Sequence, residues 1–270
     1  MPKFRHFGTG HMMWQVALKT VSHYYSVIYT LETTPKCDGS QLAQSAHMTC
    51  HVMSLAWAND AMRKLDDEMY CASLTDASVM LSGESGVGKR YAANMIHQLS
   101  SRRRAPFAAV NATGLFAGAD DGLQAAGDGT LLIQDIERIP SSTQGHLMGF
   151  LDRTATRRPM RLMTATTAQL FRLVQSGEFR DDLFYRLNVI HFTIPPLRER
   201  PEDIPLMFNH YLSLHARAEA PKLSSAARRR LLEYSWPGNV RELTAVTKRL
   251  SATSLPDLIE LEHLPGPIGD

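Results

Sequence analysis

The sequence predicts an α/β fold in which a parallel sheet flanked by helices is followed by a small all-helical region. Short apolar runs alternate with helical patterns from residue 58 to residue 200, and such alternation favours parallel strands with helices on both faces of the sheet. Over 201–265 only helical patterns remain. Prolines at positions 195, 196 and 201 mark the boundary between the two regions.

The strands of the sheet are expected in five short apolar runs: SVML, PFAAVN, GTLLIQDI, MRLMTATT and VIHFTI. Helical patterns separate them over 88–100, 141–152 and 168–177. An earlier helix, ANDAMRKLDDEMYCAS, is expected to begin after Asn59 or Asp60 as its N-cap. The all-helical region contains three further helical runs: IPLMFNHYLSLHA, SSAARRRLLEYS and NVRELTAVTKRLS.

Residues 1–57 form an N-terminal extension of partly helical pattern, and residues 266–270 form a short tail. His47 and His51 of the extension are one helical turn apart, but no carboxylate accompanies them, so a metal site is not favoured there. A stripe of apolar side chains at steps of four and three predicts a helix that packs on a core or on a partner. Its members are Trp14, Leu18, Val21, Tyr25 and Ile28.

The overall composition is that of a globular protein, with 44% apolar and 21% charged residues among 270. A net charge of +2 is too small to imply nucleic-acid binding by itself. The three cysteines, Cys37, Cys50 and Cys71, lack CxxC spacing, which disfavours a zinc site and suits a reducing compartment. No run approaches the roughly 20 apolar residues that span a bilayer, and no signal peptide is recognisable, so a cytoplasmic protein is expected.

The clearest chemical motif is GESGVGKR, in which Gly83, Gly88 and Lys89 satisfy the pattern G-x-x-x-x-G-K. It follows a predicted strand and precedes a predicted helix. Glycines allow backbone amides to turn inward around phosphate oxygens, and the helix N-terminus adds its positive dipole end. Lys89 is expected to neutralise the β- and γ-phosphates. Position 90 is an arginine, where many such loops have a hydroxyl side chain that contacts Mg²⁺.

Several stretches together resemble one family, the central AAA+ ATPase domain of bacterial enhancer-binding proteins, which are sigma-54-dependent transcriptional activators. The stretches are GESGVGK, PFAAVNAT, GTLLIQDIERIP, GEFRDDLFYRLNVIHFTIPPLRERPEDIP and YSWPGNVREL. The resemblance runs over about 58–265. It implies a P-loop AAA+ sheet followed by a helical lid, with ATP and Mg²⁺ as cofactors. The family also lacks the hydroxyl after the loop lysine.

The resemblance implies a role for each matching residue. Asn111 matches the asparagine that senses the nucleotide by contacting the Walker B glutamate, and Arg241 matches the lid arginine that reads the γ-phosphate. Arg180 and Arg186 match the arginines that enter a neighbouring subunit's site, which implies a ring, typically a hexamer. The matching Walker A residues are Gly83, Glu84, Ser85, Gly86, Val87, Gly88, Lys89 and Arg90.

The pattern departs from the family at the Walker B stretch, where Gln134 and Asp135 stand in place of Asp-Glu. Gln134 removes a charge from the metal's shell, although hard cations prefer charged oxygen ligands. Asp135 keeps a carboxylate that is one methylene shorter. On a strand Asp135 and Glu137 face the same side, so that Asp135 takes the metal with support from Glu137. The alternative is that Glu137 is a surface acid beside Arg138.

Two further departures concern the sensor and the partner-binding loop. Thr167 stands where the family has its sensor asparagine, and a hydroxyl can still hydrogen-bond to water over a shorter reach. The segment between Asn111 and Gly129 is much shorter than the family's insertion. Its sequence GLFAGA retains Phe116 of the sigma-54-contacting loop, with Ala117 in place of the central threonine. A relic of that loop and a chance match both remain open.

The chain ends without the helix-turn-helix that the family usually carries, so contact with DNA is expected to be indirect. Three functions remain open from the sequence. The first is a ring-forming ATPase that acts on sigma-54 RNA polymerase. The second is a module that binds ATP, hydrolyses it slowly or not at all because of Gln134 and Asp135, and co-assembles with an intact paralogue. The third is a paralogue that keeps the fold without a present role.

Overall fold

The computed structural model describes residues 57–116, 125–154, 160–215, 221–252 and 257–269. All of them belong to the second of two compact units, Val52–Asp270. The apolar stripe of the extension, His47, His51 and two of the three cysteines lie outside the described residues. Within the part of the chain that is described, none of the helices has the length and apolarity that crossing a membrane requires.

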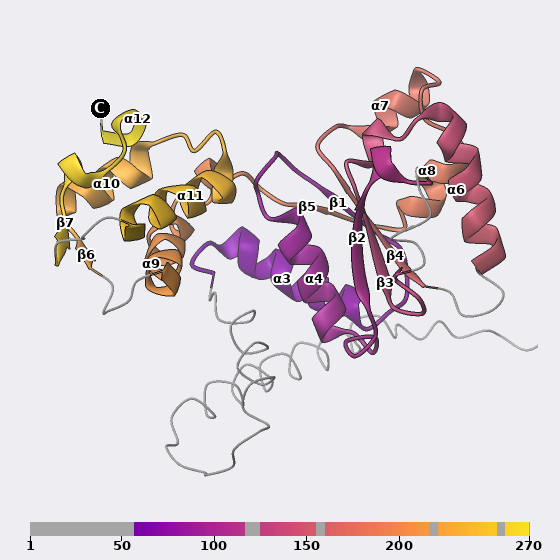
Figure 1. Ribbon diagram of the computed structural model, residues 1–270, viewed down its shortest axis with the longest axis horizontal. Coiled ribbons are helices and arrows are strands. Elements are labelled where there is room, and N and C mark those ends of the chain that lie inside the picture. Colours follow the sequence, from indigo (N-terminus) through magenta and orange to yellow (C-terminus); the bar gives the residue numbers. More distant parts are fainter. Residues whose placement is uncertain (1–56, 117–124, 155–159, 216–220, 253–256, 270) are drawn as a thin grey trace, which may run out of the picture. The chain divides into compact units, whose positions relative to one another are not determined.

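A five-stranded parallel sheet forms the centre of the fold, as the sequence predicts (Figure 1). Its strand order is β2-β3-β4-β1-β5, and its strands are β1 (Val79–Ser82), β2 (Phe107–Asn111), β3 (Thr130–Gln134), β4 (Arg161–Thr166) and β5 (Ile190–Thr193). The register brings Asn111 opposite Gln134 and Gln134 opposite Ala165. Because all strands are parallel, the side chains that follow their carboxyl ends gather at one edge of the sheet.

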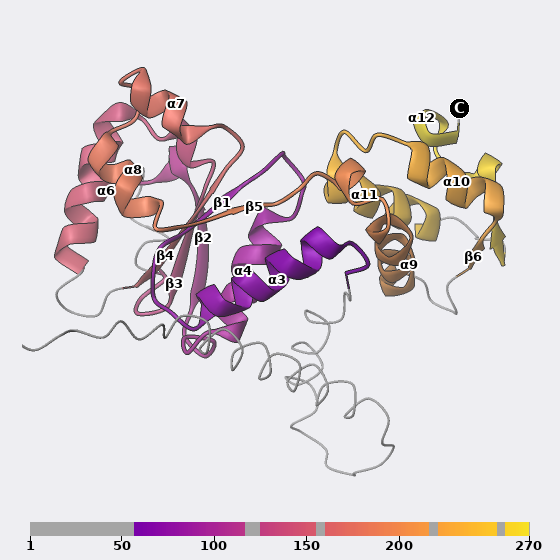
Figure 2. The same ribbon diagram turned by 180° about the vertical axis from the view of Figure 1, so that it is seen from behind.

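Helices cover both faces of this sheet, as Figures 1 and 2 show. On one face lie α3 (Asp60–Ser73) and α4 (Lys89–Leu99); on the other lie α6 (Ser141–Thr154), α7 (Leu170–Gln175) and α8 (Asp181–Leu187). Successive strand residues alternate between the two resulting cores: Leu132 packs with the α3–α4 side, and Leu131 and Ile133 pack with the α6–α8 side. The three helices predicted between strands are confirmed, whereas α8 is an additional helix.

The predicted N-cap of α3 is also confirmed. The side-chain oxygen of Asn59 accepts hydrogen bonds from the amides of Ala61 and Met62 at 3.1 and 3.2 Å. These amides have no partner within the helix, so the cap satisfies two otherwise orphaned donors.

The C-terminal region is helical, as predicted, and is built around the buried Trp236 and Phe208. Its helices are α9 (Asp203–His215), α10 (Ser225–Glu233), α11 (Asn239–Ala252) and α12 (Gly266–Gly269). The sequence pattern did not predict the short parallel pair β6 (Lys222–Leu223) and β7 (Leu258–Ile259). Short 3₁₀ turns complete the described structure: η1 (Ala112–Gly114), η2 (Ile136–Arg138), η3 (Leu197–Glu199) and η4 (Leu261–His263).

Candidate functional site

The loop between β1 and α4 has the backbone geometry of a phosphate cradle. Gly88 is the N-cap of α4 with a φ of 108°, in the left-handed region that favours glycine. Gly86 has a φ of 81°, and a Cβ there would lie 2.3 Å from the carbonyl oxygen of Gly238. The loop therefore passes too close to the C-terminal region for any side chain at position 86. Its amides and the N-terminus of α4 provide donors that suit an anion.

Lys89 lies across this loop. Its ammonium donates hydrogen bonds to the carbonyl oxygens of Gly83 and Glu84, at 2.7 and 2.9 Å. Burial lowers the pKa of Lys89, while the carboxylates of Glu137 and Asp135 act in the opposite direction. The cation of the loop is therefore within electrostatic reach of two carboxylates from the β3 end of the sheet.

The C-terminal region contacts the loop through the first turn of α11. Arg241 donates from Nη1 to Oγ of Ser85 at 2.9 Å. Asn239 donates from Nδ2 both to Glu84 and to the carbonyl oxygen of Ser85, each at 3.1 Å. Its Oδ1 accepts the amide of Leu197 at 2.7 Å. Asn239 thus ties the loop to the segment that follows β5.

Glu84 of the loop also contacts the segment that follows β5. Its two carboxylate oxygens accept from the guanidinium of Arg198 at 2.6 and 2.9 Å, a bidentate geometry. The hydrogen bonds from Arg198 and then from Asn239 lower the pKa of Glu84 to about 2. The sequence motifs containing Arg198 and Asn239 were recognised, but neither residue was singled out. The sequence features that could have identified them are the motifs PPLRER, which contains Arg198, and WPGNVREL, which contains Asn239.

Arg200 contacts the backbone of the loop at Val87. It is only 1% exposed, and its Nη2 donates to the carbonyl oxygen of Val87 at 3.0 Å. Its guanidinium also lies over the ring of Trp57, 5.6 Å from the ring centroid, a distance suited to a cation–π interaction. A buried guanidinium beside an apolar loop residue holds the loop backbone in one place.

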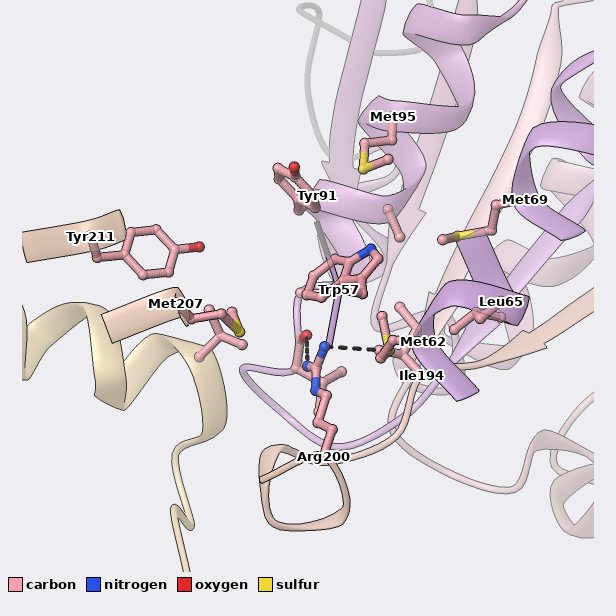
Figure 3. Close-up of a pocket in the computed structure, with 14 residues that line it drawn as sticks. Trp57, Met62, Leu65, Met69, Tyr91, Met95, Ile194, Arg200, Met207 and Tyr211 are labelled. Atoms are coloured by element: carbon pink, nitrogen blue, oxygen red, sulfur yellow. Dashed lines mark hydrogen bonds between the residues drawn. The ribbon is translucent and has the colours of Figure 1, made fainter. Parts of the chain in front are cut away.

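A small apolar cavity adjoins the loop and Arg200 (Figure 3). Its volume is about 40 Å³, which is small beside the roughly 300–1,000 Å³ of typical ligand pockets. In Figure 3 the ring of Trp57 lies at the centre of the lining side chains. The lining includes Val87, Gly88, Tyr91, Met95, Met207 and Tyr211.

Asp135 and Asn111 meet at the carboxyl ends of β3 and β2. Asn111 donates from Nδ2 to Oδ2 of Asp135 at 2.9 Å. Asn111 is itself oriented, because its Oδ1 accepts from both the amide and the hydroxyl of Thr113, at 3.1 and 2.8 Å. The asparagine and the carboxylate that the sequence motifs indicate are therefore in direct contact.

The premise that Asp135 and Glu137 share one side of a strand is wrong. Strand β3 ends at Gln134, Asp135 has left-handed backbone angles of φ 52° and ψ 46°, and Glu137 lies in η2. The alternative that Glu137 is a surface acid is also wrong. Its Oε2 is buried and has no hydrogen-bond partner among the described residues. Because the chain turns at Asp135, the alternation of side chains along a strand does not apply to Asp135 and Glu137.

Thr167 follows β4 and contacts Glu137. Its amide and its hydroxyl both donate to Oε1 of Glu137, at 3.1 and 2.5 Å. Burial acts to raise the pKa of Glu137, but the hydrogen bonds led by that of Thr167 outweigh it and the pKa is lowered. The structure therefore brings Thr167, Glu137 and Asp135 to the edge of the sheet that faces Lys89. Within the described ranges no three His, Cys, Asp or Glu side chains gather as a protein-only metal cage.

The two arginines expected to enter a neighbouring subunit's site, Arg180 and Arg186, both belong to the α8 segment. Arg180 is the N-cap residue of α8 and pairs with Asp182 through Nε and Nη2, at 3.0 and 2.6 Å. Arg186 of the same helix lies 3.5 Å from Asp152 of α6. Helix α8 is on the opposite face of the sheet from α4 (Figure 1). Arg90, in the first turn of α4, is exposed.

Phe116 packs inward on the α6 side of the sheet. It is half-buried, has a φ of 62°, and its ring meets those of His146 and Phe150 edge-on at 6.2 and 6.3 Å. Residues 117–124, which include Ala117, lie outside the described residues. In this structure Phe116 thus packs against α6.

Comparison with known proteins gives two family matches. A family model for the sigma-54 interaction domain matches residues 58–197, and one for the AAA+ ATPase lid domain matches residues 198–269. The chain is 36% identical over 243 residues to the DNA-binding transcriptional regulator NtrC of Bradyrhizobium sp. (strain RP501 Parasponia). It is 37% identical over 237 residues to the regulatory protein AtoC of Escherichia coli (strain K12). These alignments cover 78% and 76% of this chain and 51% of each relative, so the chain spans about half the length of the curated relatives it matches.

Solved structures of NtrX from Brucella abortus are also similar. The complex of NtrX with ADP has a TM-score of 0.71 and 29% identity, covering 80% of this chain and 56% of NtrX. The complex of NtrX with ATP has a TM-score of 0.67 and 26% identity, covering 95% of this chain and 63% of NtrX.

Proposed function

The chain belongs to the family of AAA+ sigma-54 interaction domains, and from this premise we propose that it binds ATP at the loop between β1 and α4 and uses it in transcription regulation. The observation that carries the proposal is the geometry of the loop. Left-handed glycines expose its amides, Lys89 lies across it, and Arg241 reaches it from α11. The similar NtrX of Brucella abortus is known in complex with ADP and with ATP.

The loop residues 83–90 are assigned to the triphosphate, with Lys89 and Arg241 as the cations nearest the β- and γ-phosphates. Amides at the N-terminus of α4 stabilise negative charge through the helix dipole. Arg90, in the first turn of α4, is assigned to the site through its backbone amide. This arrangement binds the phosphates by backbone groups whose positions are already fixed by the contacts of Val87 and Gly86.

The adenine base is assigned to the cavity lined by Val87, Tyr91 and Trp57, because it adjoins the loop and is apolar and aromatic. At about 40 Å³ the cavity does not hold a purine as it stands. Entry of the base therefore requires Trp57 or one of the flexible methionine side chains to move.

Magnesium fits the chemistry of the donor set beside the loop. Asp135 supplies a carboxylate and Gln134 an amide oxygen at the end of β3, and Mg²⁺ is commonly held by one or two carboxylates together with phosphate oxygens. When bound, the ion would neutralise the charge of the phosphates. Asn111 orients Asp135 for this role through its hydrogen bond at 2.9 Å.

Assembly with like subunits is assigned to the α8 side. Arg180 and Arg186 lie on the face of the sheet opposite α4, so we assign them to the loop of a neighbouring subunit rather than to their own, in a ring of the hexameric type. Tyr185 of the same helix is 67% exposed and Val189 after it is 60% exposed. Exposed apolar side chains grouped on one surface commonly mark an interface. Sigma-54 RNA polymerase is the proposed target of the assembly.

Equilibrium dialysis of the whole chain against labelled ATP with Mg²⁺ tests the proposal. We expect a Kd in the micromolar range, equivalent to about −8 kcal/mol. If the protein retains no label up to millimolar ATP, the assigned site is refuted.

A second candidate function, binding ATP without turning it over and co-assembling with an intact paralogue, is favoured by Gln134. Asp135 is left as the carboxylate of the Walker B pair, and removing one charge from that pair slows chemistry that depends on charge placement. Steady-state ATP hydrolysis compared between the wild type and Gln134→Asp distinguishes the two. A gain of at least about tenfold in the variant, equivalent to about 1.4 kcal/mol in the barrier, supports the co-regulator. Equal and substantial rates support the ATPase.

A further inference from the structure

Two side chains that differ from the family pattern described above, Gln134 and Thr167, lie at the ends of neighbouring strands, and Thr167 contacts a third side chain, Glu137. Gln134 ends β3, Glu137 lies three residues further on in η2, and Thr167 follows β4. Both the amide and the hydroxyl of Thr167 donate to the same oxygen of Glu137. Because its one O–H is engaged in this way, Thr167 acts on Glu137, and its hydroxyl oxygen can only accept, not donate, a further hydrogen bond.

The other carboxylate oxygen of Glu137 is left without a partner. Oε2 is buried and makes no hydrogen bond to a described residue, although the neighbouring hydroxyl of Thr166 helps to lower the pKa of Glu137. A buried carboxylate oxygen without a donor is costly, and such groups are usually satisfied by a ligand or an ion. The charge of Glu137 also acts on Lys89: burial lowers the pKa of Lys89, whereas Glu137 and, to a smaller extent, Asp135 act to raise it. Glu137 is therefore half-buried and within electrostatic reach of the lysine of the phosphate loop.

We propose that Glu137, held in place by Thr167, is a magnesium ligand of this site and restores the negative charge that is missing at Gln134. The inference rests on the proposed function, because the ion is bound together with the nucleotide. Oxygen ligands with full charge are those that Mg²⁺ prefers. With Gln134 in place of an acid, Asp135 alone would provide one carboxylate. Asp135 and Glu137 together provide two. Thr167 is a positioning residue, since it acts through Glu137.

This assignment has a consequence for affinity. In the absence of a divalent cation, the carboxylates of Asp135 and Glu137 face the negative charge of the triphosphate and weaken binding. With the cation bound, the same carboxylates favour binding. Nucleotide affinity should thus depend strongly on Mg²⁺, and the dependence should be carried largely by Glu137.

The test compares the Kd for ATP of the whole chain in Mg²⁺ and in EDTA, and takes the ratio as the magnesium enhancement. We expect an enhancement of at least tenfold in the wild type, and Glu137→Gln to reduce it at least fivefold while leaving or improving the affinity in EDTA. Thr167→Val, which removes the hydroxyl donor and retains the amide, should reduce the enhancement about twofold to threefold. Thr167→Ser should retain it. Glu233→Gln, at an exposed position of α10, is the matched control and should equal the wild type.

Circular dichroism of each variant without ligand verifies that it is folded, and Thr167→Val provides the answer if Glu137→Gln does not fold. An enhancement in Glu137→Gln within twofold of the wild-type value overturns the inference, as does binding by the wild type that does not respond to Mg²⁺. In both cases ATP still binds and the proposed function stands. If the wild type binds no ATP in either condition, the nucleotide site itself is refuted, and the inference with it.

Discussion

The two sides of the candidate site are built differently. On the loop side, residues from three separate segments hold one another: Glu84 contacts Arg198, and Asn239 reaches both Glu84 and Ser85. On the strand side, Asp135 and Glu137 each depend on one neighbouring residue, Asn111 and Thr167 respectively. The loop side is held by several side-chain contacts besides its glycine geometry, whereas each carboxylate of the strand side is oriented by one neighbour that a single substitution removes. Binding of phosphates should consequently be robust, and magnesium dependence should be adjustable.

The largest effect that separates the two sides is expected for Lys89→Ala. Removing the cation that lies across the loop should weaken ATP binding about 100-fold, or about 2.7 kcal/mol. Differential scanning fluorimetry with saturating ATP measures this as loss of the ligand-induced rise in Tm. Lys248→Ala, at an exposed position of α11, should keep the full rise. An equal rise in Lys89→Ala and the wild type would show that the nucleotide is held elsewhere.

Gly86→Ala should break the contact between the loop and α11. A methyl group at position 86 would lie 2.3 Å from the carbonyl oxygen of Gly238, and the φ of 81° is itself unfavourable for alanine. Strain of this kind costs about 1–3 kcal/mol, so urea unfolding should show a lower stability, and ATP affinity should fall about tenfold.

The matched control is Gly145→Ala in α6, where a Cβ would meet nothing within 4 Å. Alanine is favoured over glycine in a helix by about 1 kcal/mol, so this variant should be as stable as the wild type or more so. Equal stability losses in the two variants would contradict the role given to Gly86.

Arg180→Ala should leave the strength of ATP binding to a single subunit within about twofold, because the arginine is assigned to a neighbour's loop. Its effect should appear only in assembled protein, as loss of ATP-dependent oligomers in sedimentation velocity and loss of any hydrolysis. Arg172→Ala, at an exposed position of α7, provides the comparison. A large loss of affinity in dilute Arg180→Ala protein would place the side chain in its own subunit's site.

The smallest expected effect is a change with pH in the stability of the fold, through His97 of α4. His97 of α4 is 1% exposed, and its Nδ1 lies 2.8 Å from the hydroxyl of Thr130. Burial, followed by the charge of Arg161, lowers the pKa of His97 below its ordinary 6.5. The unfolded chain therefore binds a proton that the folded chain does not, so this stability is fully present above pH 6.5 and decreases as the pH falls below it through the folded-state pKa.

Urea unfolding at pH 7.5 and at pH 5.5 measures this contribution. The wild type should lose more stability between the two values than His97→Gln does. The same slope in both proteins would show that other groups determine the acid sensitivity.

The sequence predicted most of the fold because local patterns and the fold agree. The strands are apolar runs between helical stretches, and Asn59 is a cap whose signal is purely local. The pair β6 and β7 was not predicted, because two-residue strands are defined by a partner distant in the sequence rather than by a periodicity of their own. Helix α8 was part of a recognised motif, yet its seven residues are too few for a periodic pattern to identify.

The site was predicted in part for a similar reason. The contact between Asn111 and Asp135 followed from motif positions, and the register of β2 and β3 places their carboxyl ends side by side. The sequence pattern did not predict the position of Glu137, because the left-handed turn at Asp135, which ends the strand at Gln134, has no signal in that pattern. The contact of Thr167 with Glu137 joins two strand ends, so it depends on tertiary structure.

Calorimetric titration of the whole chain with magnesium-ATP, beside Lys89→Ala under the same conditions, tests the central claim most directly. The account predicts saturable heat with about one nucleotide per chain for the wild type at micromolar affinity, and little or none for the variant. Absence of heat in the wild type, or identical curves for the two proteins, would contradict it.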